Sequence, residues 1–380
     1  MKSCNYSVCL VFFLFFFPGD IHAKLYYWNQ ERLDSIRAFA LNHAVVHECI
    51  KYADSYVDKK PLVVTTKKKH FSGDKHNLEG IPPYFWREKN NGKYQWVGHD
   101  GHVNPEIKSY DNNKIYELET RLRTLSIAYF LTNDNRYFKA YIKQIKAWFI
   151  NRRTMMNPNF DYAQFIPGRS ILKGEAGGII EAYALNGIIE SYRLVYSVTR
   201  IDTRVDVVIK KWFAQLAAWM TTSENGILES RTNNNHSIAY YEDLINIAIF
   251  VNDSILLRSS VDSISKKINE QIDDIGFQKN ELSRVAAFDY SVYNLTHIID
   301  ACLMAKNAGY DLYNPNSTKI ERAAILLLDY VNNKKTFPYG NKKISDLRSI
   351  RVQCNRLLRL NPKADFTRYN PLTSNYYFVQ

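Results

Sequence analysis

Cysteine is scarce in this chain of 380 residues, which contains five. Cys4 and Cys9 lie in an apolar stretch at the N-terminus, so Cys49, Cys302 and Cys354 form the remaining set. An odd and widely spaced set excludes a disulfide framework, and none of the three has the C-x-x-C spacing of a zinc site. We therefore expect a fold stabilised by its core, which 46% hydrophobic and 14% aromatic residues can supply.

Long apolar runs are also missing, apart from VCLVFFLFFF near the N-terminus. That run follows a lysine, ends at Pro18 and is too short to cross a bilayer, and Ala23 offers a small residue for cleavage. We expect residues 1–23 to be a secretory signal peptide, so that the protein is secreted or periplasmic. Residues 24–380 would then form one domain that does not contact a membrane.

Acidic residues are outnumbered, since 38 Asp and Glu face 50 Lys and Arg, and the formal net charge is +12. Such a charge attracts anions, although it also promotes solubility. An export signal argues against nucleic acid as a partner, so the anion outside the cytoplasm could be an acidic (anionic) polysaccharide, an anionic surface or a lipid. We expect the protein itself to be a monomer.

Strand-like alternation is scarce, and the chain has neither the G-x-S-x-G motif of α/β hydrolases nor the H-E-x-x-H motif of zinc proteases. His43 and His47 have a spacing that binds metals, but no third ligand can be placed. We therefore expect neither a metal nor another cofactor.

Helical periodicity runs through most of the chain. Many helices of similar length, joined by short turns, favour an all-α domain of stacked helical hairpins. Long loops at 53–113 and 156–168 are then the natural carriers of function. We expect helices on both sides of a turn at 132–135, and further helices at 29–52, 176–198, 204–222, 236–251, 254–275, 284–306, 317–332 and 343–359.

Three asparagines and a histidine stand at the entrance of the helix expected at 236–251. Unpaired backbone N–H groups and the positive end of the helix dipole point there. Asn234, Asn235 and His236 could hold a carboxylate, because amides donate hydrogen bonds and imidazole donates one or accepts a proton. The alternative is that the amides only cap the helix and the histidine packs against it.

A second candidate is the segment in which Arg284 precedes Tyr290 and Tyr293. An arginine beside a phenol lowers the pKa of the phenol, since the phenolate gains an opposite charge. Six residues of helix turn by about 600°, so Arg284 and Tyr290 meet only if Arg284 lies at the helix entrance or before it. The alternative is that both tyrosines, two of 27 in the chain, only pack.

The loops carry aromatic and amide side chains of the kind that bind sugars. PPYFWRE contains Trp86, GHDGHVNPE contains His102, and MNPNFDYAQFIPG contains Tyr162 and Gln164. Aromatic faces stack on the apolar face of a pyranose, and amides bind its hydroxyls. Anchoring of the loops to the core is the alternative use of the same side chains.

In their order along the chain, several of these segments resemble the alginate lyase superfamily. DGHVNPEI, RTLSIAYFLTNDNRYFKAYIKQIKAWF and MNPNFDYAQFIPG are similar to its first half, NNHSIAYY to its Asn-Asn-His signature, and ELSRVAAFDYSVYNL to its later Arg–Tyr segment. The likeness covers roughly residues 25–335. It implies an all-α fold, an incomplete (α/α) toroid of helical hairpins with long functional loops, and cleavage of a polyuronate by β-elimination.

The resemblance also implies roles for single residues. Asn235, His236 and Arg284 would neutralise the carboxylate at C5, and Tyr290 would abstract the C5 proton or protonate the departing O4. His236 is the alternative base, and the product carries a 4,5-unsaturated sugar without help from a metal. The substrate would also contact Asn234, Tyr162, Gln164, Trp86, His102, Tyr240 and Tyr293.

The chain departs from the family pattern in two places. Ala239 and Tyr240 stand where relatives carry a tryptophan, and Asp289 stands where they carry a histidine near the tyrosine. A carboxylate at Asp289 would oppose a lowered pKa of Tyr290 and would repel a uronate. Tyr293 is then the stand-in phenol.

Two other functions stay open. One is a glycoside hydrolase on the same kind of helical toroid, which would use two carboxylates such as Glu175, Glu181 or Asp289. The other is a non-catalytic binder of anionic glycan, which would bind with salt-sensitive affinity and turn nothing over.

Overall fold

The computed structural model describes residues 24–38, 44–67, 70–333, 335–340 and 349–364. The expected signal peptide at 1–23 lies outside the described residues. His43 also lies outside them, as does the beginning of the helix expected at 343–359.

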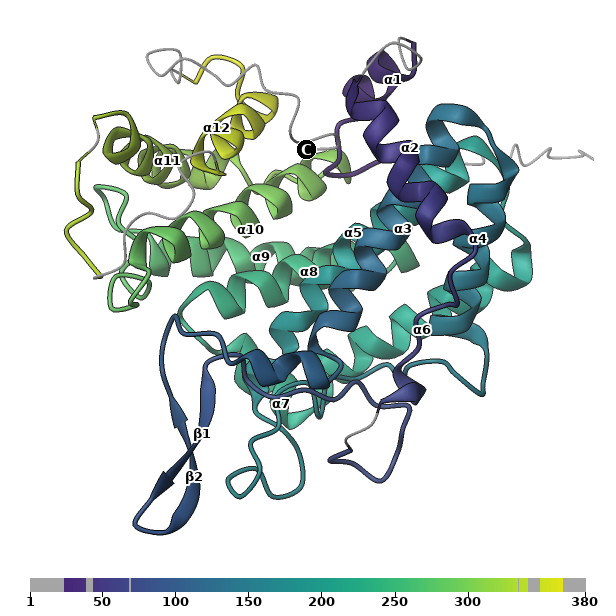
Figure 1. Ribbon diagram of the computed structural model, residues 1–380. Helices are drawn as coiled ribbons and strands as arrows, with labels where there is room; N and C mark the ends of the chain where they lie inside the picture. Colours follow the sequence, from purple (N-terminus) through teal and green to yellow (C-terminus); the bar gives the residue numbers. More distant parts are fainter. Residues whose placement is uncertain (1–23, 39–43, 68–69, 334, 341–348, 365–380) are drawn as a thin grey trace, which may run out of the picture.

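Helices make up most of the described chain (Figure 1). α8 (Asn235–Val251) is central among them, because it packs against α5 (Ala184–Val198), α6 (Thr203–Thr222), α9 (Ser254–Gln271) and α10 (Ala287–Asn307). The prediction of an all-α fold is confirmed. The other α-helices of the described chain are α1 (Gln30–Ala38), α2 (Ala44–Val57), α3 (Asn112–Thr132), α4 (Asn135–Ile145), α7 (Glu224–Ser230), α11 (Ser317–Asn332) and α12 (Ser349–Leu360).

Short helices of other types fill several connections. A π-helix, η5 (Lys146–Ile150), continues directly from α4. The 3₁₀ helices are η3 (Val64–Thr66), η4 (Pro105–Ser109), η6 (Ala176–Tyr183) and η7 (Asn314–Asn316). Of these, η6 matters for function because it leads into α5 at the edge of the pocket described below.

Side-chain caps explain where several helices begin. Asp134, Asp202, Asn234 and Asp253 each accept a hydrogen bond from a backbone N–H in the first turn of α4, α6, α8 and α9 respectively. Asn252 ends α8 in the left-handed region with a φ of 62°, a conformation that asparagine tolerates. These residues account for the short turns between neighbouring helices.

Two hydrophobic clusters form the core, and α8 contributes to both. Ile238 and Ile245 belong to one cluster, which also contains residues of α9, α10 and α11. Tyr240 and Leu244 belong to the other, with residues of α3, α5 and α6. Packing on two sides explains why α8 is buried almost all round, polar residues such as Glu242 and Asn246 included, and it fixes the first turn of α8 in place.

One β-hairpin projects from the helical body at the lower left of Figure 1. β1 (Phe85–Asn90) pairs antiparallel with β2 (Lys93–Gly98), and Asn91 and Gly92 form the turn with φ of 48° and 79°. An Asn-Gly pair at positive φ is typical of a type I′ turn. The loop expected at 53–113 therefore contains a hairpin, which the Asn-Gly pair would have revealed.

Some element boundaries differ from the prediction. Of the helix expected at 29–52, the described residues belong to α1 and α2, and residues 39–43 lie outside the described part. The helix expected at 284–306 begins only at Ala287, after a series of turns. The described part of the chain contains three cysteines, and all three are free thiols. No helix in that part is both long enough and apolar enough to cross a membrane.

Candidate active site

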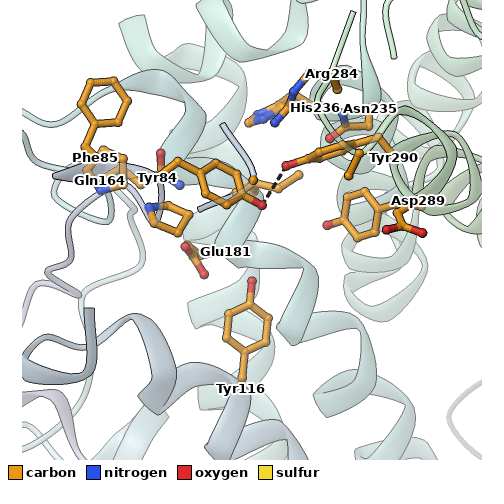
Figure 2. Close-up of a pocket in the computed structure, with 16 residues that line it drawn as sticks. Tyr84, Phe85, Tyr116, Gln164, Glu181, Asn235, His236, Arg284, Asp289 and Tyr290 are labelled. Atoms are coloured by element: carbon orange, nitrogen blue, oxygen red, sulfur yellow. Dashed lines mark hydrogen bonds between the residues drawn. The ribbon is translucent and has the colours of Figure 1, made fainter. Parts of the chain in front are cut away.

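A pocket of about 500 Å³ opens where the loops meet the first turns of α8 and α10 (Figure 2). Asn235, His236, Arg284 and Tyr290 all line it, together with Gln164 and Tyr293. Five segments of the sequence supply the rest of the wall. The remaining lining residues are Pro82, Pro83, Tyr84, Phe85, Gly101, Tyr116, Ile180, Glu181, Ala286 and Asp289.

The asparagines at the start of α8 have different tasks. Asn234 is the helix cap, since its side-chain oxygen accepts from the backbone N–H of His236 at 3.2 Å. Asn235 is buried, and its backbone N–H and its Nδ2 both donate to Glu281, at 2.7 Å and 2.9–3.0 Å. Asn233 accepts a hydrogen bond from Lys267 at 2.9 Å. Only Asn235 of the three reaches the pocket.

His236 is held by a buried acid. Its Nδ1 lies 2.6 Å from Oε1 of Glu229, a residue of α7 that is 2% exposed. A Cβ atom at position 177 would lie 3.3 Å from Cε1 of His236, so Gly177 leaves space for the ring. Burial lowers the pKa of His236, but its hydrogen bond to Glu229 and the charges of Glu229 and Glu281 outweigh burial, so the pKa lies above the ordinary value of 6.5.

Arg284 lies in the turns before α10, which is the placement that allows it to meet Tyr290. Its guanidinium carbon is 3.6 Å from the centre of the Tyr290 ring. Asp100, from the loop after β2, accepts from Nε of Arg284 at 3.1 Å and from a terminal nitrogen at 2.6 Å. Asp100 also accepts from the backbone N–H of Val285 at 2.9 Å, so it fixes both the turn and the side chain.

Tyr290 donates a hydrogen bond to the hydroxyl of Tyr84 at 2.8 Å, as Figure 2 shows. Burial and this bond raise the pKa of Tyr290 above the ordinary value of 10.0, although Arg284 lowers it. The predicted lowering of the Tyr290 pKa is therefore wrong in its net direction. The effect of the arginine has the expected sign, but burial is larger.

The other end of the pocket contains a carboxyl group. Glu181, from η6, is buried and accepts from Nδ2 of Asn112 at 3.4 Å, and burial raises its pKa above the ordinary value. Figure 2 shows the phenol of Tyr116 pointing toward Glu181, with Asn235, His236 and Arg284 gathered at the opposite end. The pocket thus has a nitrogen-rich end and an end lined by a carboxyl and a phenol.

Five of the residues expected to contact substrate have other tasks. Tyr240 is 3% exposed, lies in the core and donates to the backbone oxygen of Met220, so it does not reach the pocket. Tyr162 donates to the backbone oxygen of Leu172, and Nε1 of Trp86 donates to the backbone oxygen of His102. These three residues and Asn234 stabilise loops, the core or the helix end instead of lining the pocket, and His102, the fifth, does not line it either. Gln164 and Tyr293 do line it.

The carboxylates behind the pocket were missed by sequence reasoning. Glu229, Glu281 and Asp100 carry no local signal, because each meets its partner only through the fold. Tyr84 lies in the PPYFWRE segment that was noted for its aromatic residues, but nothing singled it out. Glu175, a candidate for glycoside hydrolysis, is not among the lining residues, whereas Glu181 and Asp289 are.

Comparison with known proteins gives the pocket a family context. Residues 63–337 match the sequence profile of the family described as alginate lyase. An alginate lyase of Pseudomonas aeruginosa is 26% identical over 208 residues, and the alignment covers 54% of this chain and 54% of that protein. The chain therefore spans about half the length of this curated relative.

Solved structures are similar over more of the chain. The crystal structure of an alginate lyase from Bacteroides ovatus is 29% identical, with a TM-score of 0.83, and the match covers 90% of this chain and 93% of that one. Alginate lyase A1-III from Sphingomonas species A1 is 16% identical with a TM-score of 0.54, which indicates a shared fold. These likenesses confirm the prediction of an all-α toroid. Because the family profile matches well over half of the sequence, the chain belongs to the alginate lyase family.

Proposed function

We propose that this protein is a polysaccharide lyase that cleaves alginate or a related polyuronate by β-elimination and leaves 4,5-unsaturated ends. The observation that carries the proposal is the convergence of Asn235, His236, Arg284 and Tyr290 on one pocket. The names of the relatives point the same way, since two variants of alginate lyase A1-III were solved as complexes with a tetrasaccharide.

Removal of the C5 proton requires the negative charge of the uronate carboxylate to be offset. Without that, a second negative charge would develop beside the first in the enolate-like intermediate. Arg284 supplies a permanent positive charge, and Asn235 supplies an amide at the same end of the pocket. Both are already oriented by buried or half-buried acids, Asp100 and Glu281, so little reorganisation is needed when substrate binds.

His236 is the proposed base. Its Nδ1 is taken by Glu229, so Nε2 is the nitrogen through which the imidazole acts on a substrate. An acid at Nδ1 fixes the ring orientation and stabilises the imidazolium that forms when the base takes a proton. A pKa above 6.5 also strengthens His236 as a base near neutral pH.

Tyr290 is the proposed acid. Its pKa is raised, so the phenol keeps its proton at neutral pH and can deliver it to the departing O4. This assignment replaces the expectation that a lowered pKa makes Tyr290 the base. The C5 proton then goes to His236, the C4–O4 bond breaks, and the electron pair on C5 forms the C4–C5 double bond.

We also propose that the protein acts outside the cytoplasm. The support is the sequence of residues 1–23, which combines a lysine, a short apolar run and a small residue for cleavage. A polymeric substrate that does not enter cells is consistent with such a location. Fusion of residues 1–23 to a reporter enzyme, with export measured by fractionation, tests this directly.

The lyase is tested by incubating the protein with sodium alginate, polymannuronate, polyguluronate and glucuronan while following the ultraviolet absorbance of unsaturated uronates. We expect absorbance to rise with at least one polymer, and we expect His236→Ala to abolish the rise. Lys266→Gln is the matched control, because Lys266 lies on α9 with a side chain that is 78% exposed. No absorbance with any of the four polymers would refute the proposal.

The same assay, with reducing ends also measured, tests the alternative that the protein is a glycoside hydrolase. One observation favours this alternative. Glu181 and Asp289 line the same pocket, as a pair of catalytic carboxylates would. New reducing ends without unsaturated products would favour hydrolysis. Reducing ends and absorbance in equal amounts would exclude it.

A further inference from the structure

A second groove, with a volume of about 530 Å³, lies on α4 and the π-helix that follows it. Figure 1 shows α4 at the right of the molecule, across the body from the β1–β2 hairpin whose base borders the pocket. The groove therefore belongs to a different surface from the candidate active site. No step of the proposed elimination uses it.

The floor of the groove is apolar. Pro61, Phe138 and Ile142 line it, and each is half-buried. Phe138 is fixed by the ring of Tyr129, with 5.4 Å between the ring centres. Such a floor is rigid and offers carbon atoms on which the apolar face of a sugar ring can lie.

The rim of the groove is cationic. Lys139, Lys143 and Lys146 line it at spacings of four and three residues, and all three side chains are exposed. In the described part of the chain, no ion pair joins any of them to a carboxylate, whereas the neighbouring Arg136 pairs with Asp134 at 2.8 Å. Like charges at these spacings destabilise an isolated helix, and the three exposed lysines are not part of the core. The stability of the fold therefore does not explain why they lie together.

The charge extends beyond the rim. Residues 135–153 contain no aspartate or glutamate. Their cations are Arg136, which is paired with Asp134 and Asp54, and Lys139, Lys143, Lys146, Arg152 and Arg153. An uninterrupted stretch of this kind creates a local positive field at the surface. An anion with several charges in a row is the ligand that such a field favours.

The backbone of the groove is unusual as well. Lys146–Ile150 forms a π-helix, in which the backbone N–H of Asn151 donates to the oxygen of Lys146 at 2.8 Å. π-helices are rare and occur frequently at functional sites. Here the π-helix places Lys146 and Ala147 on the groove wall beside the end of α4.

We propose that this groove is a second, non-catalytic binding site for an acidic polysaccharide. Lys139 to Lys146 span about 10 Å along the helix, the length of two successive pyranose rings. Rings would lie on the apolar floor while their carboxylates meet the lysines. The site holds the enzyme on a long polymer, which raises the effective concentration of chain at the catalytic pocket.

The proposal takes its substrate class from the proposed function, but binding at the groove needs no catalysis. The test is therefore a binding experiment on the full mature chain with Arg284→Ala, which removes the permanent cation from the pocket. Electrophoresis in a native gel containing sodium alginate measures retardation, and a gel containing neutral dextran corrects for sieving.

The groove variant is Lys143→Gln with Lys146→Gln, and the control is Lys266→Gln with Lys363→Gln. Both variants lose two exposed lysines and the same net charge, but neither control residue lines the groove. We expect the dissociation constant for alginate to rise about three- to tenfold in the groove variant and to stay unchanged in the control. Equal retardation of the two variants would overturn the proposal.

The outcomes separate this site from the proposed lyase. With Arg284 restored, the groove variant should cleave a uronate tetrasaccharide normally while its KM for long alginate rises. Groove-dependent retardation in a protein that cleaves no polyuronate would support the groove and refute the lyase. Cleavage of a polyuronate, with retardation that the groove variant does not change, would support the lyase and refute the groove site. The polysaccharide site would also be overturned if the groove variant lost binding to duplex DNA or to anionic phosphatidylserine vesicles but still bound alginate like the wild type.

Discussion

Tyr290 and Tyr84 share one hydrogen bond, and removing the hydroxyl of each in turn separates chemistry from packing. Tyr290→Phe and Tyr84→Phe both delete one oxygen atom and both break the same 2.8 Å bond. The proposed mechanism assigns a proton transfer to Tyr290 and none to Tyr84. The two variants should therefore differ greatly in rate although they lose the same contact.

The expected magnitudes follow from the two roles. Loss of a general acid slows a reaction by about 10²- to 10⁴-fold, which raises the barrier by about 3 to 5 kcal/mol. Loss of a neutral hydrogen bond costs about 0.5–1.5 kcal/mol, so Tyr84→Phe should slow the reaction by about tenfold at most. The bond to Tyr84 also raises the pKa of Tyr290. Burial still raises this pKa in Tyr84→Phe, so neither the wild type nor this variant should lose activity through ionisation of Tyr290 below pH 10.

The assay is kcat on alginate, or on whichever polyuronate gives the highest rate, measured by ultraviolet absorbance from pH 6 to pH 10. Far-ultraviolet circular dichroism checks that both variants fold. If Tyr290→Phe keeps more than about a tenth of the wild-type kcat, Tyr290 is not the acid. If both variants lose activity equally, the pair acts through structure and the assignment of separate roles is wrong.

Three further variants test two acids behind the pocket and one tyrosine in the core. Glu229→Gln removes a cause that raises the pKa of His236, so activity should begin at lower pH. The ring also loses its orienting acid, so kcat should fall by about tenfold or more. A pH–rate profile measures both effects. Asp100→Asn weakens the anchoring of Arg284, so KM should rise by about tenfold with a smaller change in kcat, measured by steady-state kinetics. Tyr240→Phe should leave kcat/KM unchanged and lower the free energy of unfolding by about 0.5–1.5 kcal/mol in urea denaturation, because its buried hydroxyl serves only the core.

The helical body could be predicted because its signals are local. Leu118, Leu122, Leu125 and Tyr129 repeat at helical spacing, and all four are buried on α3. Asp134 lies in the turn expected at 132–135 and caps α4, as a short polar residue before a periodic run predicts. Such patterns involve neighbours a few residues apart, which a single sequence displays directly.

The support of the site could not be predicted because its contacts are distant in the sequence. Arg284 and Asp100 are 184 residues apart, and Tyr290 and Tyr84 are 206 residues apart. The pKa of Tyr290 shows the same limit. Its arginine neighbour was inferred correctly, but the larger effect of burial depends on atoms that only the fold brings near.

The two proposed sites should respond differently to salt because their cations are exposed to different degrees. In the pocket, the side chains of Arg284 and His236 are only 22% and 27% exposed, and each is held by a carboxylate at 2.6 Å, so salt screens their contact with an incoming uronate less. In the groove, Lys139, Lys143 and Lys146 are exposed, and their attraction for a polyanion is open to screening. The Debye length falls from about 10 Å at 0.1 M salt to about 3 Å at 1 M.

Raising sodium chloride over that range should therefore release the protein from alginate beads while the KM for a uronate tetrasaccharide changes by less than about twofold. The groove variant should elute from the beads at lower salt than the wild type, with an unchanged tetrasaccharide KM. If the tetrasaccharide KM rises with salt as steeply as binding to the beads falls, the pocket also binds through charges that salt screens. In that case salt screens Arg284 and His236 in the pocket as strongly as the exposed lysines of the groove, and the expected difference between the two sites is wrong.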